Sequence, residues 1–357
     1  MEEMAAVFLP DDALVGVLGL LPPRSLAAAR CVCRPWRRVV DDRRLLLPHL
    51  LPRSVGGFFL NYYDHETVAT GSSFFARPET AETHPPTAAC GPRIDGEFSF
   101  VTAGREEPYH WHVVLGHCDG LVLFAGDGMY LCNPATRWWA RLPPPHPRGY
   151  YRRRAHVVFD PAASPPHWEM EEEHGEISEE DGAAWRTMEW PPATWTWHAI
   201  SSRTMRWVER VFVREGAAAG TVAGLKLHSE DWADAPWRYG AYSQGALYIR
   251  CGGDHISRIS MSTNKYQVIK SPIDPAECRK QGMQSIIGRS KNLCMEVIFL
   301  GFHPCKEVIF LYMSTVKLVA CHLKSTEIQY LGGLLGPVSY NCGLEESFVY
   351  TPCLVGL

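Results

Sequence analysis

A strand–turn–strand layout recurs along this 357-residue chain and constrains its fold more than any other feature. In the clearest copy, four short apolar runs are separated by turn residues such as Asp119-Gly120 and Asn133-Pro134. The runs occupy residues 113–117, 121–125, 129–132 and 138–142. Short strands that alternate with tight turns predict a four-stranded antiparallel meander, the unit of a β-propeller blade.

Further copies of this layout follow at a regular interval. The second spans residues 239–270, the third spans 295–331, and a partial copy surrounds Ser202-Arg203-Thr204. The last turns therefore recur with a period of about 60 residues, and long loops would explain why this exceeds the ~40–50 of a common propeller blade. Repeats of this kind bury a core between neighbouring units. We therefore expect an all-β, irregular propeller-like domain over residues 51–357.

The first 50 residues carry a helical pattern instead. Apolar residues recur at i, i+3, i+4 and i+7, as on one face of a helix: Leu14, Val17, Leu18 and Leu21. Asp11 and Asp12 are candidate N-caps, and Pro22-Pro23 ends the helix. Two more helices are predicted over Ser25–Cys33 and from Pro35 onward. Three such short helices are near the lower size limit for independent folding, so some apolar side chains should be available to a partner.

Composition narrows the class of protein. The net charge of −4 and the pI of about 6.4 indicate no general attraction to nucleic acid. The apolar stretches around Leu14–Leu21 and Leu45–Leu51 are too short for a transmembrane helix. Glu2 and Glu3 stand where a signal peptide would be basic, so the 12 cysteines are expected as thiols in the cytosol or nucleus.

The N-terminal residues resemble the F-box. The similarity lies in Leu9-Pro10-Asp11-Asp12, then Val17-Leu18 and Leu21-Pro22, then Leu26 and Arg30-Cys31-Val32-Cys33 before Trp36. The resemblance implies an F-box over residues 5–50 that docks on the Skp adaptor of a cullin-type ubiquitin ligase. It also implies which residues supply the docking surface or the packing beneath it: Leu9, Pro10, Leu14, Val17, Leu18, Leu21, Pro22, Leu26, Val32 and Trp36.

The strand repeats are similar to the F-box-associated β domains of plant F-box proteins, including kelch-like members. Gly116-His117-Cys118-Asp119-Gly120-Leu121 and Asn133-Pro134-Ala135-Thr136-Arg137-Trp138 resemble two of their turns, although His117-Cys118-Asp119 departs from the usual Cys-Asn. A stretch from Phe299 to Val308 resembles a segment common in grass members. The fold class implied is α+β: a three-helix F-box followed by repeated four-stranded meanders.

Four other segments could carry chemistry. Residues 169–182 begin with eight acids in thirteen positions, which predicts a solvated, disordered loop or an acidic lure for a basic substrate. Cys31 and Cys33 lack the spacing and second pair of a zinc site. His110, His112 and His117 beside Cys118 are more typical of strand histidines than of a metal site. The basic, aromatic stretch Arg148–Arg154 favours a loop or substrate contact over RNA binding.

No catalytic motif, metal site or cofactor-binding loop is found in the sequence. The resemblance to the F-box then implies a non-catalytic substrate receptor of a Skp–cullin–F-box ligase, with a cullin reached through the adaptor and a protein substrate of unknown identity. The loops near 143–154, 231–238 and 303–306 are the expected substrate contacts, because loops on a rigid scaffold carry binding. The alternatives are a scaffold that binds the adaptor without substrate turnover, and a propeller enzyme with a central metal or polar triad.

Overall fold

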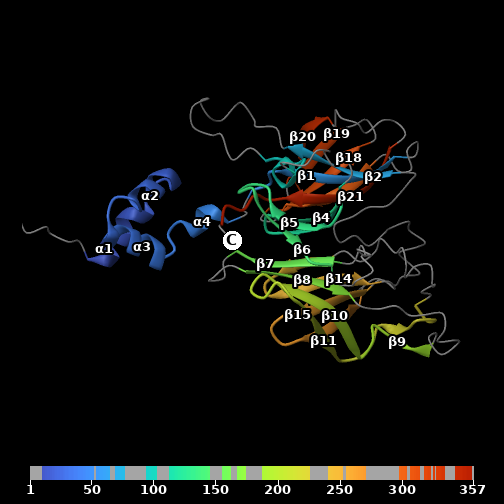
Figure 1. Cartoon of the computed structure of the whole chain (residues 1–357). Coiled ribbons are helices and arrows are strands. Elements are labelled where there is room, and N and C mark those ends of the chain that lie inside the picture. The colour runs from blue at the N-terminus through green and yellow to red at the C-terminus, as the bar shows by residue number, and fades with distance from the viewer. Residues whose placement is uncertain are drawn as a thin grey trace, which may run out of the picture.

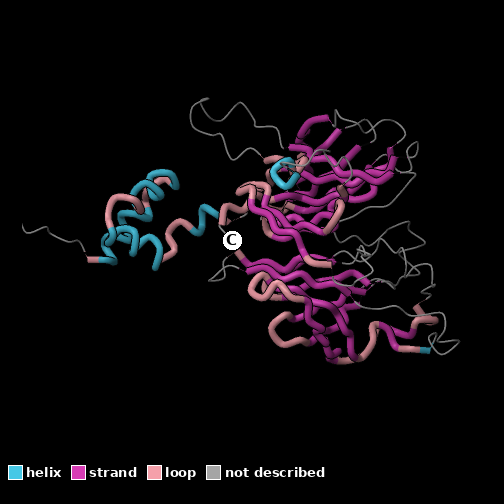
Figure 2. Tube along the Cα trace, viewed as in Figure 1, coloured by secondary structure: helices cyan, strands magenta, loops and turns pink. Residues whose placement is uncertain are grey.

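The chain has a small helical part followed by a β-rich, propeller-like part, which confirms the predicted fold class. In the computed structural model, helices lie at one end and strands make up almost all the rest (Figures 1 and 2). The structure describes residues 10–51, 54–64, 69–76, 94–102, 112–144, 155–161, 167–173, 187–225, 240–251, 255–270, 297–303, 306–313, 317–322, 325, 327–333 and 342–355.

Three helices form the N-terminal unit: α1 Asp11–Gly19, α2 Pro23–Ala29 and α3 Arg34–Asp42. Pro23 and Pro35 lie in the first turns of α2 and α3, where the missing N–H breaks no helical hydrogen bond. Buried apolar side chains from all three helices form one core: Leu14, Leu18, Leu26, Ala29, Val39 and Val40. The i and i+4 positions of the predicted apolar face, Leu14 and Leu18, thus point inward, whereas Val17 at i+3 is exposed.

Two local details of this unit differ from the prediction. Pro10 occupies the N-cap of α1, and Asp11 and Asp12 lie in its first turn, where carboxylates favour the positive end of the helix dipole. The second helix ends at Ala29 rather than at Cys33. The chain reverses through residues 30–33, and the extended backbone of Cys33, with φ of −156°, begins α3.

Three predicted meanders are present, each with its strands antiparallel and in chain order. The first contains β3 Val113–Cys118, β4 Leu121–Ala125, β5 Met129–Asn133 and β6 Trp138–Leu142. The second contains β13 Gly240–Ser243, β14 Ala246–Cys251, β15 His255–Ser260 and β16 Lys265–Lys270. The third contains β17 Val297–Phe302, β18 Val308–Met313, β19 Lys317–His322 and β20 Ile328–Gly333.

The turn residues that predicted these hairpins have the expected backbone. Asp119 and Gly120 have φ of 44° and 91°, and Gln244 and Gly245 have φ of 50° and 78°. Two successive positive φ values are typical of the two-residue turn whose twist matches antiparallel strands. The two turns are therefore equivalent positions in two repeats.

The partial copy is completed by strands that the sequence did not reveal. It contains β7 Ala155–Asp160, β8 His167–Glu173, β10 Thr194–Ser201 and β11 Trp207–Glu215. A parallel pairing from Val213↔Lys265 to Glu215↔Gln267 then joins β11 to β16, so two four-stranded units form one eight-stranded sheet. A two-stranded sheet beside it consists of β9 Glu189–Trp190 and β12 Gly220–Thr221.

One further sheet was not predicted, and it joins the two ends of the β-rich part. It has the order β2–β1–β21, with β1 Gly57–Asp64, β2 Ala69–Ala76 and β21 Cys342–Tyr350. The short helix α5 Ser99–Thr102 contributes Val101 to the same core as Phe59, and Phe98 just before the helix stacks on Phe59. Pairing of β1 with β21 from Gly57↔Tyr350 to Asp64↔Cys342 brings together residues that lie far apart in the sequence.

The two faces of β1 are buried in different cores. Phe58 packs edge-on against Phe310 of the β17–β20 sheet, with ring centroids 4.9 Å apart. Phe59 stacks on Phe98, which stacks on Phe124 of β4 at 4.4 Å. Since successive side chains of a strand point to opposite faces, β1 connects its two neighbouring sheets.

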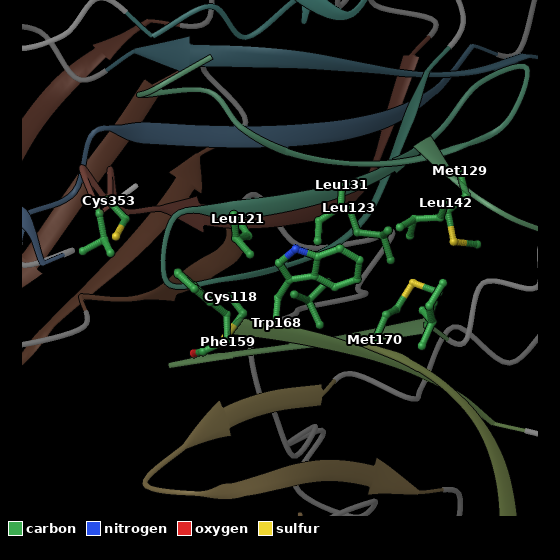
Figure 3. Close-up of a cluster of buried hydrophobic side chains, with 14 residues drawn as sticks. Cys118, Leu121, Leu123, Met129, Leu131, Leu142, Phe159, Trp168, Met170 and Cys353 are labelled. Atoms are coloured by element: carbon green, nitrogen blue, oxygen red, sulfur yellow. The ribbon is translucent and has the colours of Figure 1, made fainter. Parts of the chain in front are cut away.

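A third core lies between the β3–β6 sheet and β7–β8. Figure 3 shows Trp168 and Phe159 from one side facing Leu121, Leu123 and Leu131 from the other. All five side chains are at least 99% buried. This core therefore fixes the first complete meander against the next.

The predicted loop at 169–182 is wrong for its first five residues, which belong to β8. Trp168 and Met170 alternate with Glu169 and point into the core, so the period-2 pattern of a strand outweighs the charge density. Glu169 accepts a hydrogen bond of 3.0 Å from Arg210 of β11, which compensates its partial burial. Residues 174–182 lie outside the described part of the chain.

We predict that Trp197→Ala destabilises the β-rich part strongly. Trp197 is fully buried and packs edge-on against Trp195 and Phe212, with ring centroids 5.2 and 5.4 Å away. Loss of a buried Trp costs about 3–5 kcal/mol in free energy of unfolding. Denaturant unfolding followed by far-ultraviolet circular dichroism measures it. Trp139, which is 42% exposed, gives the control Trp139→Ala, and equal losses for both variants would contradict the assignment of this core.

Candidate functional site

The predicted adaptor-docking residues divide into a buried and an exposed group. Leu14, Leu18 and Leu26 form the core of the helical unit, and Leu21 and Trp36 pack on it half-buried. The exposed members are Pro10, Val17, Pro22 and Val32, and Leu9 lies outside the described residues. The buried members can support a docking surface but cannot themselves form it.

Three apolar side chains of this unit are exposed to an unusual degree. Val17 is 55% exposed, Val32 is 67% exposed and Leu20 is 86% exposed. Val17 and Leu20 are three residues apart, which makes them neighbours on a helical surface. Leu20 was missed in the sequence because the apolar spacing continues through Leu21, whereas α1 ends at Gly19 and Leu20 turns outward at its C-cap.

Exposed ion pairs link the helices of this unit. The carboxylates of Asp11 and Asp12 lie 3.4 and 2.9 Å from the guanidinium groups of Arg38 and Arg43. Arg30 donates two hydrogen bonds to Asp41, and this carboxylate raises the pKa of the arginine. Exposed pairs contribute little to stability. The three pairs link α1 to α3 and the end of α2 to α3.

A run of leucines lies where the helical unit meets the β-rich part. Leu45 and Leu46 pack on the core of the helical unit. Leu47, Leu50 and Leu51, in and next to α4 Leu47–Leu50, pack on the core that contains Trp168. Consecutive residues thus belong to two different cores. The predicted domain boundary between residues 50 and 51 remains a prediction. Leu50 and Leu51 lie on either side of it and pack on the same core.

The turns of the first meander also contact the C-terminal segment. Asn133 is fully buried, and its Nδ2 donates to the carbonyl oxygen of Cys353 at 2.9 Å. Its Oδ1 accepts hydrogen bonds from the backbone N–H groups of Ala135 and Thr136 at 3.0 and 3.4 Å. The Asn-Pro-Ala-Thr turn therefore binds the C-terminal segment in addition to joining two strands.

Comparison with known proteins identifies the helical unit. An F-box-like family model matches residues 7–47. Residues 7–47 are therefore F-box-like. The β-rich part of the chain follows this unit, as the resemblance of the strand repeats to F-box-associated domains implied.

The chain is also similar to curated plant proteins. The chain is 31% identical over 144 residues to an F-box/kelch-repeat protein of Arabidopsis thaliana, covering 39% of this chain and 30% of the relative. It is 27% identical over 144 residues to an F-box protein of the same plant, covering 38% of this chain and 32% of the relative. The chain thus spans about a third of the length of these relatives.

The histidines weighed as metal ligands pack against aromatic rings. His112 contacts Phe98 at 5.0 Å and His117 contacts Phe348 at 5.8 Å, whereas His110 is outside the described residues. Among the described residues, no three histidine, cysteine or acidic side chains are grouped as a metal site requires. Cys31 and Cys33 are exposed thiols at the end of α2 and the start of α3.

The buried thiols have the chemistry of small apolar groups. Burial raises the pKa of Cys118 and Cys132 far above the ordinary range, and raises the pKa of Cys353 to about 11. At neutral pH these thiols are protonated, and a protonated thiol is a poor nucleophile.

The remaining predicted segments are mostly outside the described residues. They are Arg148–Arg154, the loop at 231–238, and all but the first two residues of the loop at 143–154. Of the loop at 303–306, only His303 and Lys306 are described, and His303 is buried near Phe310. Within the described ranges, no helix is long and apolar enough to span a membrane.

We predict that acid destabilises the β-rich part through two partly buried histidines. Burial lowers the pKa of His112 and His117 to about 4, so the folded state holds both rings neutral. An unfolded histidine has a pKa of about 6.5, so stability falls as pH falls from 6.5 to 4. His117→Gln should lose less stability than wild type over this window, by up to about 3 kcal/mol.

Circular dichroism at a series of pH values measures this difference. Asp119 changes stability with pH in the opposite direction, because burial and the nearby Asp160 raise its pKa to about 6. Wild type and His117→Gln both contain Asp119, so its effect cancels in the comparison. The exposed His49 gives the control His49→Gln, which should follow wild type. An unchanged pH dependence for His117→Gln would contradict the burial of this ring.

Proposed function

We propose that this chain is the substrate-receptor subunit of a Skp–cullin–F-box-type ubiquitin ligase. The F-box docks on a Skp-type adaptor, and the β-rich part holds a protein substrate for ubiquitination. The observation that carries the proposal is the set of exposed apolar side chains on the F-box, Val17, Leu20 and Val32, above a core that is already filled by other residues.

The energetics suit a docking surface. Burial of one large apolar side chain at an interface contributes roughly 1.5–3 kcal/mol. A few such anchors dominate the affinity of most protein interfaces. Val17 and Leu20 together are therefore sufficient to account for a large part of adaptor affinity.

The chain performs no chemistry of its own in this proposal. Its contribution is proximity, because a substrate lysine held near a ubiquitin-charged enzyme reacts at a raised effective concentration. The substrate surface is placed in the inter-strand loops of the β-rich part. We also propose a cytosolic or nuclear location, on the basis of the thiol-rich composition.

We predict that Val17→Asp weakens adaptor binding at least tenfold while the F-box stays folded. The substitution places a charge on an exposed side chain that the adaptor would desolvate. We expect the affinity to fall at least tenfold, which corresponds to about 1.4 kcal/mol of binding free energy. Calorimetry with a purified Skp-type adaptor measures it. Val208 on β11 has the same exposed fraction of 55%, so Val208→Asp is the matched control and should bind as wild type. Equal affinities for the two variants would refute docking through α1.

We predict a different outcome for Leu18→Asp. Leu18 is 1% exposed, so the charge would lie in the helical core and unfold α1–α3. Amide exchange should be fast throughout the F-box in this variant and slow in Val17→Asp. Slow exchange in both variants would contradict the assigned inward face of α1.

Proximity labelling separates a receptor from a scaffold without turnover. The intact chain and Val17→Asp are compared under proteasome inhibition. A receptor predicts a co-purifying cullin and partners whose abundance rises when this chain is depleted. Partners whose abundance stays constant, with adaptor binding intact, would favour the scaffold.

A further inference from the structure

The last described residues of the chain are buried although they form no strand or helix. Thr351, Cys353 and Val355 are 7%, 0% and 6% exposed, and Leu354 between them is 38% exposed. They follow β21 directly. Alternate side chains of this segment are therefore buried between other elements of the fold.

The first meander holds this segment from one side. Gly120 approaches Cys353 so closely that a Cβ atom on Gly120 would lie 2.4 Å from the Cβ of Cys353 and 2.7 Å from its backbone nitrogen. The hydrogen bond from Asn133 Nδ2 fixes the carbonyl oxygen of the same residue. Both of the turns that carry the sequence motifs of the first meander thus contact Cys353.

The helix α4 holds the segment from the other side. The backbone N–H of Leu354 donates to the carbonyl oxygen of Leu50 at 2.8 Å. Leu47, Leu50 and Leu51 pack in the same core as Cys353 and Val355. Figure 1 shows α4 between the other helices and the β-rich part, next to the C-terminal end of the chain.

We propose that the C-terminal segment Thr351–Val355 fixes the position of the F-box relative to the β-rich part by fastening α4 to the turns at Gly120 and Asn133. Leu354 and Cys353 are positioning residues in this arrangement. The leucine run supplies apolar contact, which is non-directional, whereas the hydrogen bond from Leu354 to Leu50 is directional and sets how α4 is oriented. In the proposed function, on which this consequence rests, the segment fixes where a bound substrate lies relative to the adaptor.

The matched pair Leu354→Pro and Leu354→Ala tests the proposal in the full chain. Proline removes the N–H that bonds Leu50, whereas alanine keeps it and loses only a partly exposed side chain. We expect amides of residues 47–51 to exchange about tenfold faster in Leu354→Pro than in Leu354→Ala, as the loss of one backbone hydrogen bond allows. Small-angle scattering should show a wider spread of distances between the F-box and the β-rich part, at an unchanged melting temperature of the latter.

Equal exchange at residues 47–51 in the two variants, with identical scattering, would overturn the proposal. A merely structural role for Leu354 predicts a lower melting temperature without a change in scattering, and that result would overturn it too.

A second pair covers the case in which Leu354→Pro fails to fold. Gly120→Ala and Gly245→Ala place the same side chain at equivalent turn positions with φ of 91° and 78°. Nothing lies within 4 Å of the Cβ position at Gly245, so only Gly120→Ala displaces Cys353. Faster exchange at residues 47–51 in Gly120→Ala alone would support the proposal, and the same exchange in both would overturn it.

Adaptor affinity separates this proposal from the proposed function. All four variants leave α1–α3 unchanged and should bind a Skp-type adaptor as wild type does. Failure of the wild-type chain to bind would refute the proposed function, while the exchange and scattering results would still decide the role of the C-terminal segment.

Discussion

The pairing of β1 with β21 is the interaction on which the rest of the structure depends. It joins the first and last strands of the β-rich part, and both faces of the pair are covered by neighbouring sheets. Asn61 of β1 reinforces it from within. Its Nδ2 donates to the carbonyl of Val114 at 2.7 Å and to Glu346 at 2.8 Å, and its Oδ1 accepts from Ser72 and from the N–H of Val114. One buried, fully bonded amide thus links four strands, and a buried polar group with all its partners specifies a single arrangement.

This closure also explains how the F-box is attached. In the sequence, α4 precedes β1, and β21 comes directly before the segment that contacts Leu50. The two ends of the β-rich part therefore lie together, at the point where the helices join it (Figure 1). Leu47, Leu50 and Leu51 are partly buried there and pack against a core, whereas a flexible linker would be polar and exposed.

Much of the fold could be predicted because turn chemistry is local. Asp119-Gly120 and Asn133-Pro134 identify their turns by backbone preference alone, and the hairpins that they form are those expected. Strand β21 was missed because it pairs with β1 at the other end of the β-rich part, so no short turn motif marks the pairing. The parallel contact between β11 and β16 was equally invisible, since it joins two repeats that each look complete in the sequence.

For the candidate site, the sequence by itself determined which residues are apolar, where α1–α3 form, and the resemblance to the F-box. Which apolar residues face outward was decided only by the tertiary structure. Leu18 and Leu20 have similar hydrophobicity and differ in exposure from 1% to 86%, because the end of α1 rotates one inward and the other outward. Likewise, the sequence identifies Asn133 only as a turn residue and Cys353 only as a thiol. Their contact exists only because the pairing of β1 with β21 places the end of the chain beside its first meander.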